Sequence, residues 1–283
     1  MKKRTFFYDF KNCIDFDLPS RRKLEKRLGD YDVLAEYTIC AVRDMGHSIK
    51  GNASKKEFFK EKLRLHKVNM SGYVEYPNKE HDLCMLFMVN TNAMLNDYID
   101  SYAKDIRALI NPDFEMPGDN AMSKVEKLLF ALKKNNIEFT IPVWVLQCLN
   151  YYRLVRNNIA HNDGEQRQCK EAYEGIDKKA LNNDYPIFIG KAPNPIENIC
   201  MNDFYFYSAC VKHFANYTVM ALKGKVNWSE IGAIHPLFRL ENIPFGTNPK
   251  TWINRVLNDY HCKATKQDRD AIYEVIKARK NKR

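Results

Sequence analysis

The chain has 283 residues, 45% of them hydrophobic, and a formal net charge of +10 at pH 7. This is enough apolar sequence for a sizeable core, and eight scattered cysteines without a CxxC pair argue against a compact disulfide framework or a zinc site. The longest apolar stretch, 83–89, is far below the roughly 20 residues that a bilayer span needs, and the apolar stretch after the first four residues is too short for a signal peptide. We therefore expect a soluble, cytoplasmic protein with no membrane partner, no metal and no cofactor.

Apolar residues at helical spacing predict an all-α protein. The expected helices span about residues 20–45, 55–66, 80–110, 122–136, 141–161, 164–182, 203–223, 249–260 and 266–280. Ser123, followed by Glu126 three residues later, predicts a capping box at the start of the fourth helix. Prolines and glycines predict a long loop at 183–202 and an irregular segment at 225–248.

The basic charge is concentrated at the two ends of the chain. Residues 1–79 carry 18 Lys and Arg against 11 Asp and Glu, and residues 247–283 carry 10 against 4, whereas residues 80–246 carry 17 against 20. We divide the chain into a basic helical N-terminal extension at 1–79, a helical bundle at 80–225, and an irregular segment with a basic helical C-terminal extension at 226–283. The ends are not treated as independent domains. The basic charge of the ends is typical of surfaces that contact a nucleic acid, but it is also common on helix faces that are simply exposed to solvent. Both interpretations stay open.

The segment 50–67 interleaves four large apolar residues with basic ones. As a helix it would dock its apolar face on the bundle and turn its basic face toward an RNA backbone, although a solvated amphipathic helix fits the same pattern. The last seven residues, KARKNKR, predict a flexible basic tail. The candidate RNA-binding residues are Lys55, Lys56, Lys60, Lys62, Arg64, Lys67 and, in the bundle, Arg153.

The stretch RNNIAH at 156–161 ends the helix expected at 141–161. At about 100° per residue, Arg156 falls inside an apolar stripe, so its guanidinium needs a carboxylate partner or a cleft that admits an anion. His161 lies about 140° from Arg156 on an ideal helix. One shared site then needs the chain to leave the helix at 162–164, or a second copy to supply its own pair. The stripe consists of Val145, Cys148, Leu149, Tyr152, Val155 and Ile159.

These residues resemble the R-x4-6-H motif of the HEPN superfamily, in which an asparagine often follows the arginine, as Asn157 does here. The context is similar too, because a long apolar helix at 80–110 precedes the motif helix and an aromatic helix at 203–223 closes the bundle. The resemblance covers about residues 80–225. It implies a HEPN-like helical bundle and a metal-independent endoribonuclease of the kind found among prokaryotic toxins and antiviral abortive-infection proteins.

The resemblance implies Arg156, His161 and Asn157 as catalytic residues of a homodimer that acts on RNA. A neutral His161 would move a proton at the ribose 2′-hydroxyl or the leaving 5′-oxygen, and Arg156 would hold the phosphate, leaving a 2′,3′-cyclic phosphate. An antitoxin or a sensor protein is a further partner that fits this biology. The alternative is a non-catalytic HEPN module that binds RNA or a nucleotide, or pairs with a partner protein. A separate, purely structural interpretation is that His161 is only a favourable cation at a helix C-terminus and that Arg156 pairs with a carboxylate.

Overall fold

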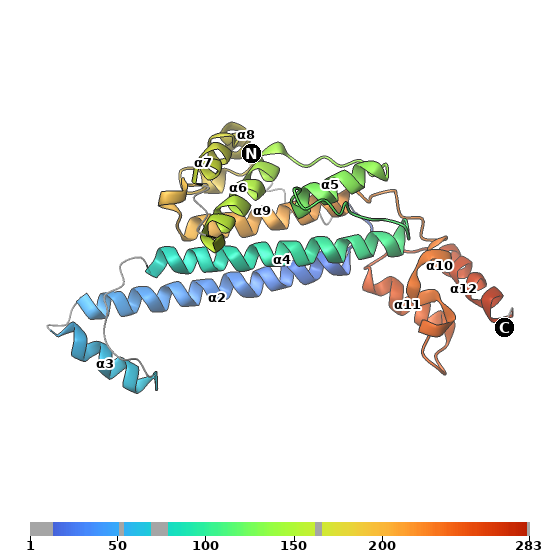
Figure 1. The fold of residues 1–283 in the computed structure, drawn as a ribbon. Coiled ribbons are helices and arrows are strands. Elements are labelled where there is room, and N and C mark those ends of the chain that lie inside the picture. The colour runs from blue at the N-terminus through green and yellow to red at the C-terminus, as the bar shows by residue number, and fades with distance from the viewer. Residues whose placement is uncertain (1–13, 51–53, 69–78, 162–165, 282–283) are drawn as a thin grey trace, which may run out of the picture.

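The computed structural model describes residues 14–50, 54–68, 79–161 and 166–281, and over these ranges the protein contains helices and no strand. The all-α prediction is confirmed. The two longest helices, α2 (Pro19–Lys50) and α4 (Lys79–Leu109), lie side by side along much of the molecule (Figure 1). Together they form the long base on which the other helices rest.

Five helices lie above α4 in Figure 1 and make up the rest of the bundle. Among them α9 is central, because it contacts α2, α4 and α6 and buries residues on nearly all of its sides. Two short 3-10 helices, Pro186–Phe188 and Ile196–Asn198, lie in the predicted loop between α8 and α9. The five helices are α5 (Lys124–Lys134), α6 (Val143–His161), α7 (Gln166–Glu174), α8 (Lys178–Asp184) and α9 (Met201–Met220).

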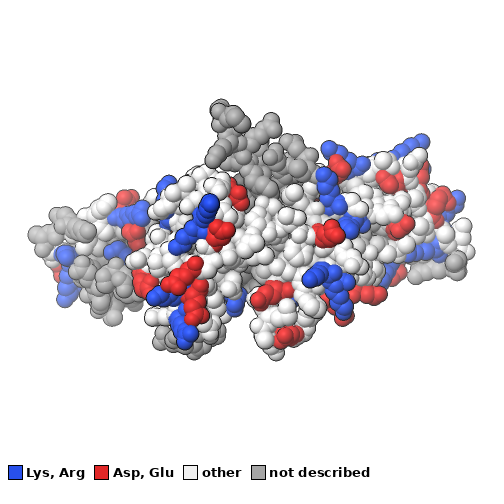
Figure 2. Space-filling model, turned by 90° about the horizontal axis from the view of Figure 1, so that it is seen from above, with Lys and Arg blue, Asp and Glu red and all other residues white. Residues whose placement is uncertain are grey.

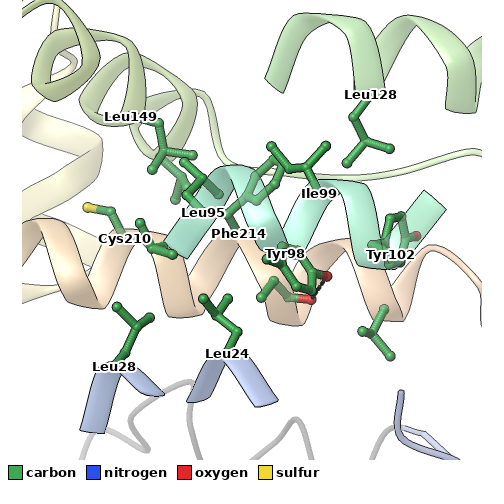
Figure 3. Packing of buried hydrophobic residues seen from close by; sticks show 14 of the residues in the cluster. Leu24, Leu28, Leu95, Tyr98, Ile99, Tyr102, Leu128, Leu149, Cys210 and Phe214 are labelled. Atoms are coloured by element: carbon green, nitrogen blue, oxygen red, sulfur yellow. Dashed lines mark hydrogen bonds between the residues drawn. The ribbon is translucent and has the colours of Figure 1, made fainter. Parts of the chain in front are cut away.

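One continuous hydrophobic core joins α2, α4, α5, α6 and α9 (Figure 3). Each large apolar side chain buried in it contributes roughly 1.5–3 kcal/mol relative to an exposed position. Because α2 buries its own leucines in this core, the helix is an integral part of the bundle. The side chains that meet at the centre, each at most 3% exposed, are Leu24, Leu28, Leu95, Ile99, Leu128, Leu149 and Phe214.

A buried carboxylate fixes α6 to the start of α9. The Oδ1 atom of Asp203 accepts hydrogen bonds from the Tyr152 hydroxyl at 3.0 Å and the Asn194 backbone N–H at 2.8 Å. Its Oδ2 atom accepts from the Cys200 backbone N–H at 2.9 Å and the Asn194 side-chain amide at 2.8 Å. Burial raises the pKa of Asp203, while these four donors oppose the shift. The network therefore sets where the outer face of α6 sits relative to α9.

The C-terminal helices α10 (Ile231–Ile234), α11 (Pro249–Asp259) and α12 (Lys266–Lys280) gather at one end of the molecule (Figure 1). Two 3-10 helices, Pro236–Phe238 and Leu240–Asn242, join them, so the segment predicted as irregular holds short helical turns. The guanidinium of Arg279 donates hydrogen bonds to three backbone carbonyls of this region. The prediction of a flexible tail is therefore wrong for the part of it that belongs to α12.

Two other predictions differ from the structure. The helix expected at 164–182 is two helices, because the chain breaks at Gly175 and Asp177 caps α8 by accepting from the Ala180 N–H at 2.9 Å. The helix α3 (Lys55–Leu65) buries no residue and projects beyond the end of the α2–α4 pair (Figure 1). Its expected docking on the bundle at 80–225 is wrong: α3 lies against α2, with Phe58, Phe59 and Leu63 half-buried and no residue fully buried, as in the solvated amphipathic alternative.

Candidate functional site

The apolar stripe predicted on α6 packs into the bundle almost as expected. Val145, Cys148, Leu149, Tyr152 and Val155 are at most 2% exposed. Ile159 is 37% exposed, so its predicted place in the stripe is wrong, because the last turn of α6 extends past the core. The outer edge of the stripe carries Arg153, Arg156 and Asn157 at helical spacings of three and four, which puts them on one face.

Arg156 is half-buried and incompletely paired. Its Nη1 donates a hydrogen bond to Asn157 Oδ1 at 3.0 Å. Its Nε atom is buried and, among the described residues, has neither a hydrogen-bond partner nor a carboxylate in an ion pair with the guanidinium. The expected alternative, in which Arg156 forms a structural salt bridge, therefore has no carboxylate to support it among the described residues.

Arg21 on α2 shows how this fold accommodates a buried arginine that is structural. Its side chain is 8% exposed, and Nε and Nη2 donate to both carboxylate oxygens of Asp17 at 2.6 Å. Nη1 donates to Glu25 at 2.9 Å and to Asn216 at 3.2 Å. The guanidinium of Arg156, by contrast with that of Arg21, donates only to the side-chain amide of Asn157 and to no carboxylate among the described residues.

Arg153 lies one turn before Arg156 and has a similar environment. Its Nη2 donates to Asn150 Oδ1 at 2.8 Å, while its Nε is buried without a hydrogen-bond partner. Both arginines act on the buried Tyr207 of α9, where burial raises the pKa of the phenol and the two positive charges partly oppose the shift. The Tyr207 hydroxyl donates to Asn92 Oδ1 on α4 at 3.1 Å. Two cations and two buried polar groups thus meet where α4, α6 and α9 converge.

A pocket of about 300 Å³ opens beside Arg153, between α4, α5 and α6. Its polar lining includes Asn92, Asn96 and Asn150, which the sequence analysis did not single out. A signal was present, because Asn92 and Asn96 are four residues apart in α4 and so share a face, on which Leu95 is also buried. Helical periodicity alone could not show that this face is opposed by α6 rather than by solvent.

His161 is the last residue of α6, so the helix ends where the sequence predicts. Its side chain, and the expected departure of the chain at 162–164, lie outside the described residues. Between the backbone positions of Arg156 and His161, the helix imposes a rotation of about 140°. Asn157, the third predicted catalytic residue, is half-buried and orients Arg156 through the hydrogen bond to Nη1.

The predicted RNA-binding residues fall in two separate places. Arg153 lies beside Arg156, whereas the basic residues of α3 and Lys67 lie beyond the end of the α2–α4 pair, away from α6 (Figure 1). On α3, Lys60 pairs with Glu57 at 3.2 Å and Lys62 lies over the Phe58 ring at 5.4 Å. The structure does not bring the residues of α3, namely Lys55, Lys56, Lys60, Lys62 and Arg64, to the motif helix.

The surface above the bundle has mixed charge. Figure 2 shows Lys and Arg interspersed with Asp and Glu on the face that carries α5 to α8. Within the described ranges no group of three or more His, Cys, Asp or Glu side chains could hold a metal ion. None of the described helices is both long and apolar enough to cross a bilayer.

Comparison with protein-family models, with curated proteins and with solved structures finds no match to the chain. The site is therefore interpreted from its own residues and geometry.

Proposed function

We propose that the protein is a metal-independent endoribonuclease of HEPN type, which acts as a homodimer in the cytoplasm in prokaryotic toxin or antiviral defence. The observation that supports this best is the state of Arg156. Its guanidinium is half-buried on the outer face of α6, with a buried Nε that lacks a hydrogen-bond partner and no described carboxylate in an ion pair. Nη2 of Arg156 donates to no described residue and is left for a phosphate, which takes two parallel N–H bonds from an arginine that turns its Nε edge toward it.

The proposed chemistry uses the chain's own side chains. A neutral His161 imidazole removes the proton of a ribose 2′-hydroxyl, and the 2′-oxygen attacks the adjacent phosphorus. The bond from phosphorus to the 5′-oxygen breaks, and the leaving oxygen takes the proton that the His161 imidazole had removed, which restores the neutral imidazole. Arg156 stabilises the negative charge that develops on the phosphoryl oxygens, and Asn157 holds the guanidinium in place. The products are a 2′,3′-cyclic phosphate and a 5′-hydroxyl.

The dimer belongs to the proposal because of the rotation between the two motif positions on α6. A single ideal helix separates Arg156 and His161 by about 140°, which is unfavourable for one shared site. A two-fold axis beside the end of α6 would let each copy complete the other's cleft. Mixing Arg156→Ala and His161→Ala chains tests this arrangement, since a shared cleft predicts that the mixture recovers activity that neither variant has alone.

The deciding experiment is cleavage of a defined single-stranded RNA by the purified protein in EDTA. We expect wild type to cut the RNA and to leave 2′,3′-cyclic phosphate ends, detected by mass spectrometry of the products. Arg156→Ala and His161→Ala should abolish cleavage, whereas His47→Ala, at an exposed position of α2, should not. The same oligonucleotide with 2′-O-methyl riboses should remain uncut, because it lacks the attacking hydroxyl.

Cleavage that requires a metal, or that His161→Ala leaves unchanged, would refute this assignment. RNA binding without cleavage, unaffected by His161→Ala, would instead support the alternative of a non-catalytic module that binds RNA or a nucleotide. An antitoxin or sensor protein would be sought next in that case, since co-purification with such a partner can hold a toxin silent.

A further inference from the structure

The pocket between α4, α5 and α6 has the size and walls of a site for one small flat group. Its volume of about 300 Å³ is at the lower end of the range for small-molecule sites. Leu95 and Leu149, each 2% exposed, and the half-buried Val125, Leu129 and Leu146 supply its apolar lining. Apolar walls favour the faces of a ring and disfavour a hydrated ion.

The rim of the pocket offers hydrogen bonds that the protein does not use internally. Asn96 is half-buried and makes no hydrogen bond to a described residue. Asn92 and Asn150 use their side-chain oxygens for Tyr207 and Arg153, and neither amide nitrogen donates to a described residue. Carboxamides carry a donor and an acceptor side by side, which is the pattern that the edges of nucleobases present.

Two of the three charged residues that line the pocket, Lys124 and Glu126, have partners, and the third is Arg153. Lys124 pairs with Asp100. Glu126 accepts a hydrogen bond from the Ser123 backbone N–H at 2.7 Å, and the Ser123 side chain, backbone donors and the charge of Arg153 lower the pKa of that carboxyl. Glu126 is exposed, so an anion at the mouth of the pocket would meet this carboxylate, and one placed deeper would meet the apolar walls. The occupant that fits is therefore neutral, flat and polar at its edge.

The pocket adjoins the proposed catalytic arginine. Arg153 lines the pocket and lies three residues before Arg156, so the two side chains are neighbours on one face of α6. If a phosphate of an RNA strand contacts Arg156, the base next to that phosphate would thus lie at the mouth of the pocket.

From these observations we infer that the pocket takes one unpaired nucleobase of a single-stranded RNA, next to the phosphate held by Arg156. The inference rests on the proposed function, because it places the RNA that the enzyme cuts. A base inside a duplex has its edge paired and its faces stacked, so entry requires a single strand or an extruded nucleotide. The pocket then gives the nuclease its preference for single strands and for the base beside the cut.

Binding, measured without cleavage, tests the inference separately from the nuclease. Fluorescence anisotropy on His161→Ala protein in EDTA compares a labelled single-stranded RNA with the same strand carrying one abasic ribose at successive positions. We expect at least tenfold weaker binding for the abasic strand at one position and little change at the others. Asn96→Trp, which fills the pocket from a half-buried position, should remove this difference.

Two further variants keep the test independent of folding. Asn96→Leu removes the amide at nearly constant size and should weaken the base preference, whereas Asn254→Leu, the same change at an exposed position of α11, should leave it intact. Equal affinity for intact and abasic strands, or a preference that survives in both Asn96 variants, would overturn the inference. Tight binding of a nucleoside monophosphate without binding of the strand would assign the pocket to a free nucleotide and would also overturn it. Absence of cleavage with the base preference intact would instead count against the proposed nuclease alone.

Discussion

Replacing Arg156 by methionine separates a functional arginine from a structural one. Methionine keeps an unbranched apolar stem of similar length, so the packing of α6 against the bundle is largely retained. The substitution removes the hydrogen bond from Nη1 to Asn157 and the buried Nε that has no partner. The two losses act on the free energy of unfolding with opposite sign.

The expected magnitude follows from these two terms. Loss of the part-buried hydrogen bond to Asn157 costs about 0.5–1.5 kcal/mol, and removal of an unsatisfied buried donor gains about 1–3 kcal/mol. The net change for Arg156→Met therefore lies between a loss of about 0.5 and a gain of about 2.5 kcal/mol. The same substitution at Arg21 leaves the carboxylate of Asp17, 15% exposed, without its partner. Arg21→Met should cost about 3–5 kcal/mol.

Thermal unfolding of the two variants beside wild type provides the assay. About 2–4 °C of Tm corresponds to 1 kcal/mol for a protein somewhat smaller than this one. We expect the Tm of Arg156→Met to be unchanged or higher with RNA cleavage lost, and the Tm of Arg21→Met to fall by roughly 6 °C or more. A fall in Tm for Arg156→Met comparable to that of Arg21→Met would refute the view that Arg156 is kept for binding a phosphate.

Three other results are expected. The logarithm of RNA affinity should fall with the logarithm of salt concentration. Replacing the basic residues of α3 by glutamine should make this slope shallower by about 0.7 for each phosphate that α3 no longer neutralises, and an unchanged slope would exclude α3 from the interface. Asp203→Ala should cost several kcal/mol in urea unfolding, at about 1–3 kcal/mol for each of the buried donors that it leaves unpaired, and a cost below about 1 kcal/mol would contradict the network. Burial raises the pKa of Asp105 from its usual 3.8 to about 6. The folded state thus favours the protonated carboxyl, and its contribution to stability is full below pH 3.8 and lost as pH rises through 6. The free energy of unfolding of Asp105→Asn, relative to that of wild type, should therefore rise by up to about 3 kcal/mol between pH 4 and pH 7.5. Curves of unfolding free energy against pH that stay parallel for the two proteins would rule this out.

Much of the helical framework could be predicted from local sequence. The capping box of Ser123 and Glu126 is present with both of its hydrogen bonds, because it depends only on residues three apart. The apolar stripe of α6 was predicted from rotation per residue, and its buried members through Val155 face the core. Ile159 does not, since the length of the neighbouring helices, which decides where the core ends, is not encoded in α6.

The remaining features depend on contacts between distant segments. Gln147 accepts from the Asp177 N–H at 2.9 Å and donates to the Gly175 carbonyl at 2.7 Å, which holds the break between α7 and α8 against α6. Glycine and aspartate at this point were visible in the sequence, but an amphipathic pattern on both sides favoured one continuous helix. The pocket likewise needs α4, α5 and α6 together, so no single stretch of sequence indicates it.

The outer face of α6 carries two buried guanidinium nitrogens that have no hydrogen-bond partner among the described residues, and their position beside the pocket connects the two proposals. Asp203 and Arg21 are buried and paired several times over. Single unpartnered atoms also occur at Ser20, Asp32, Asp105 and Arg269, but none of these residues lines this pocket. Arg153 and Arg156 each bury an Nε without a partner, on neighbouring turns and beside a pocket with unused amide groups. Each such donor costs about 1–3 kcal/mol of stability. Natural proteins accept costs of this kind mainly at functional sites. A single ligand with a phosphate and a neutral base would contact both the arginines and the unused amides, so the two proposals require the same stretch of single-stranded RNA.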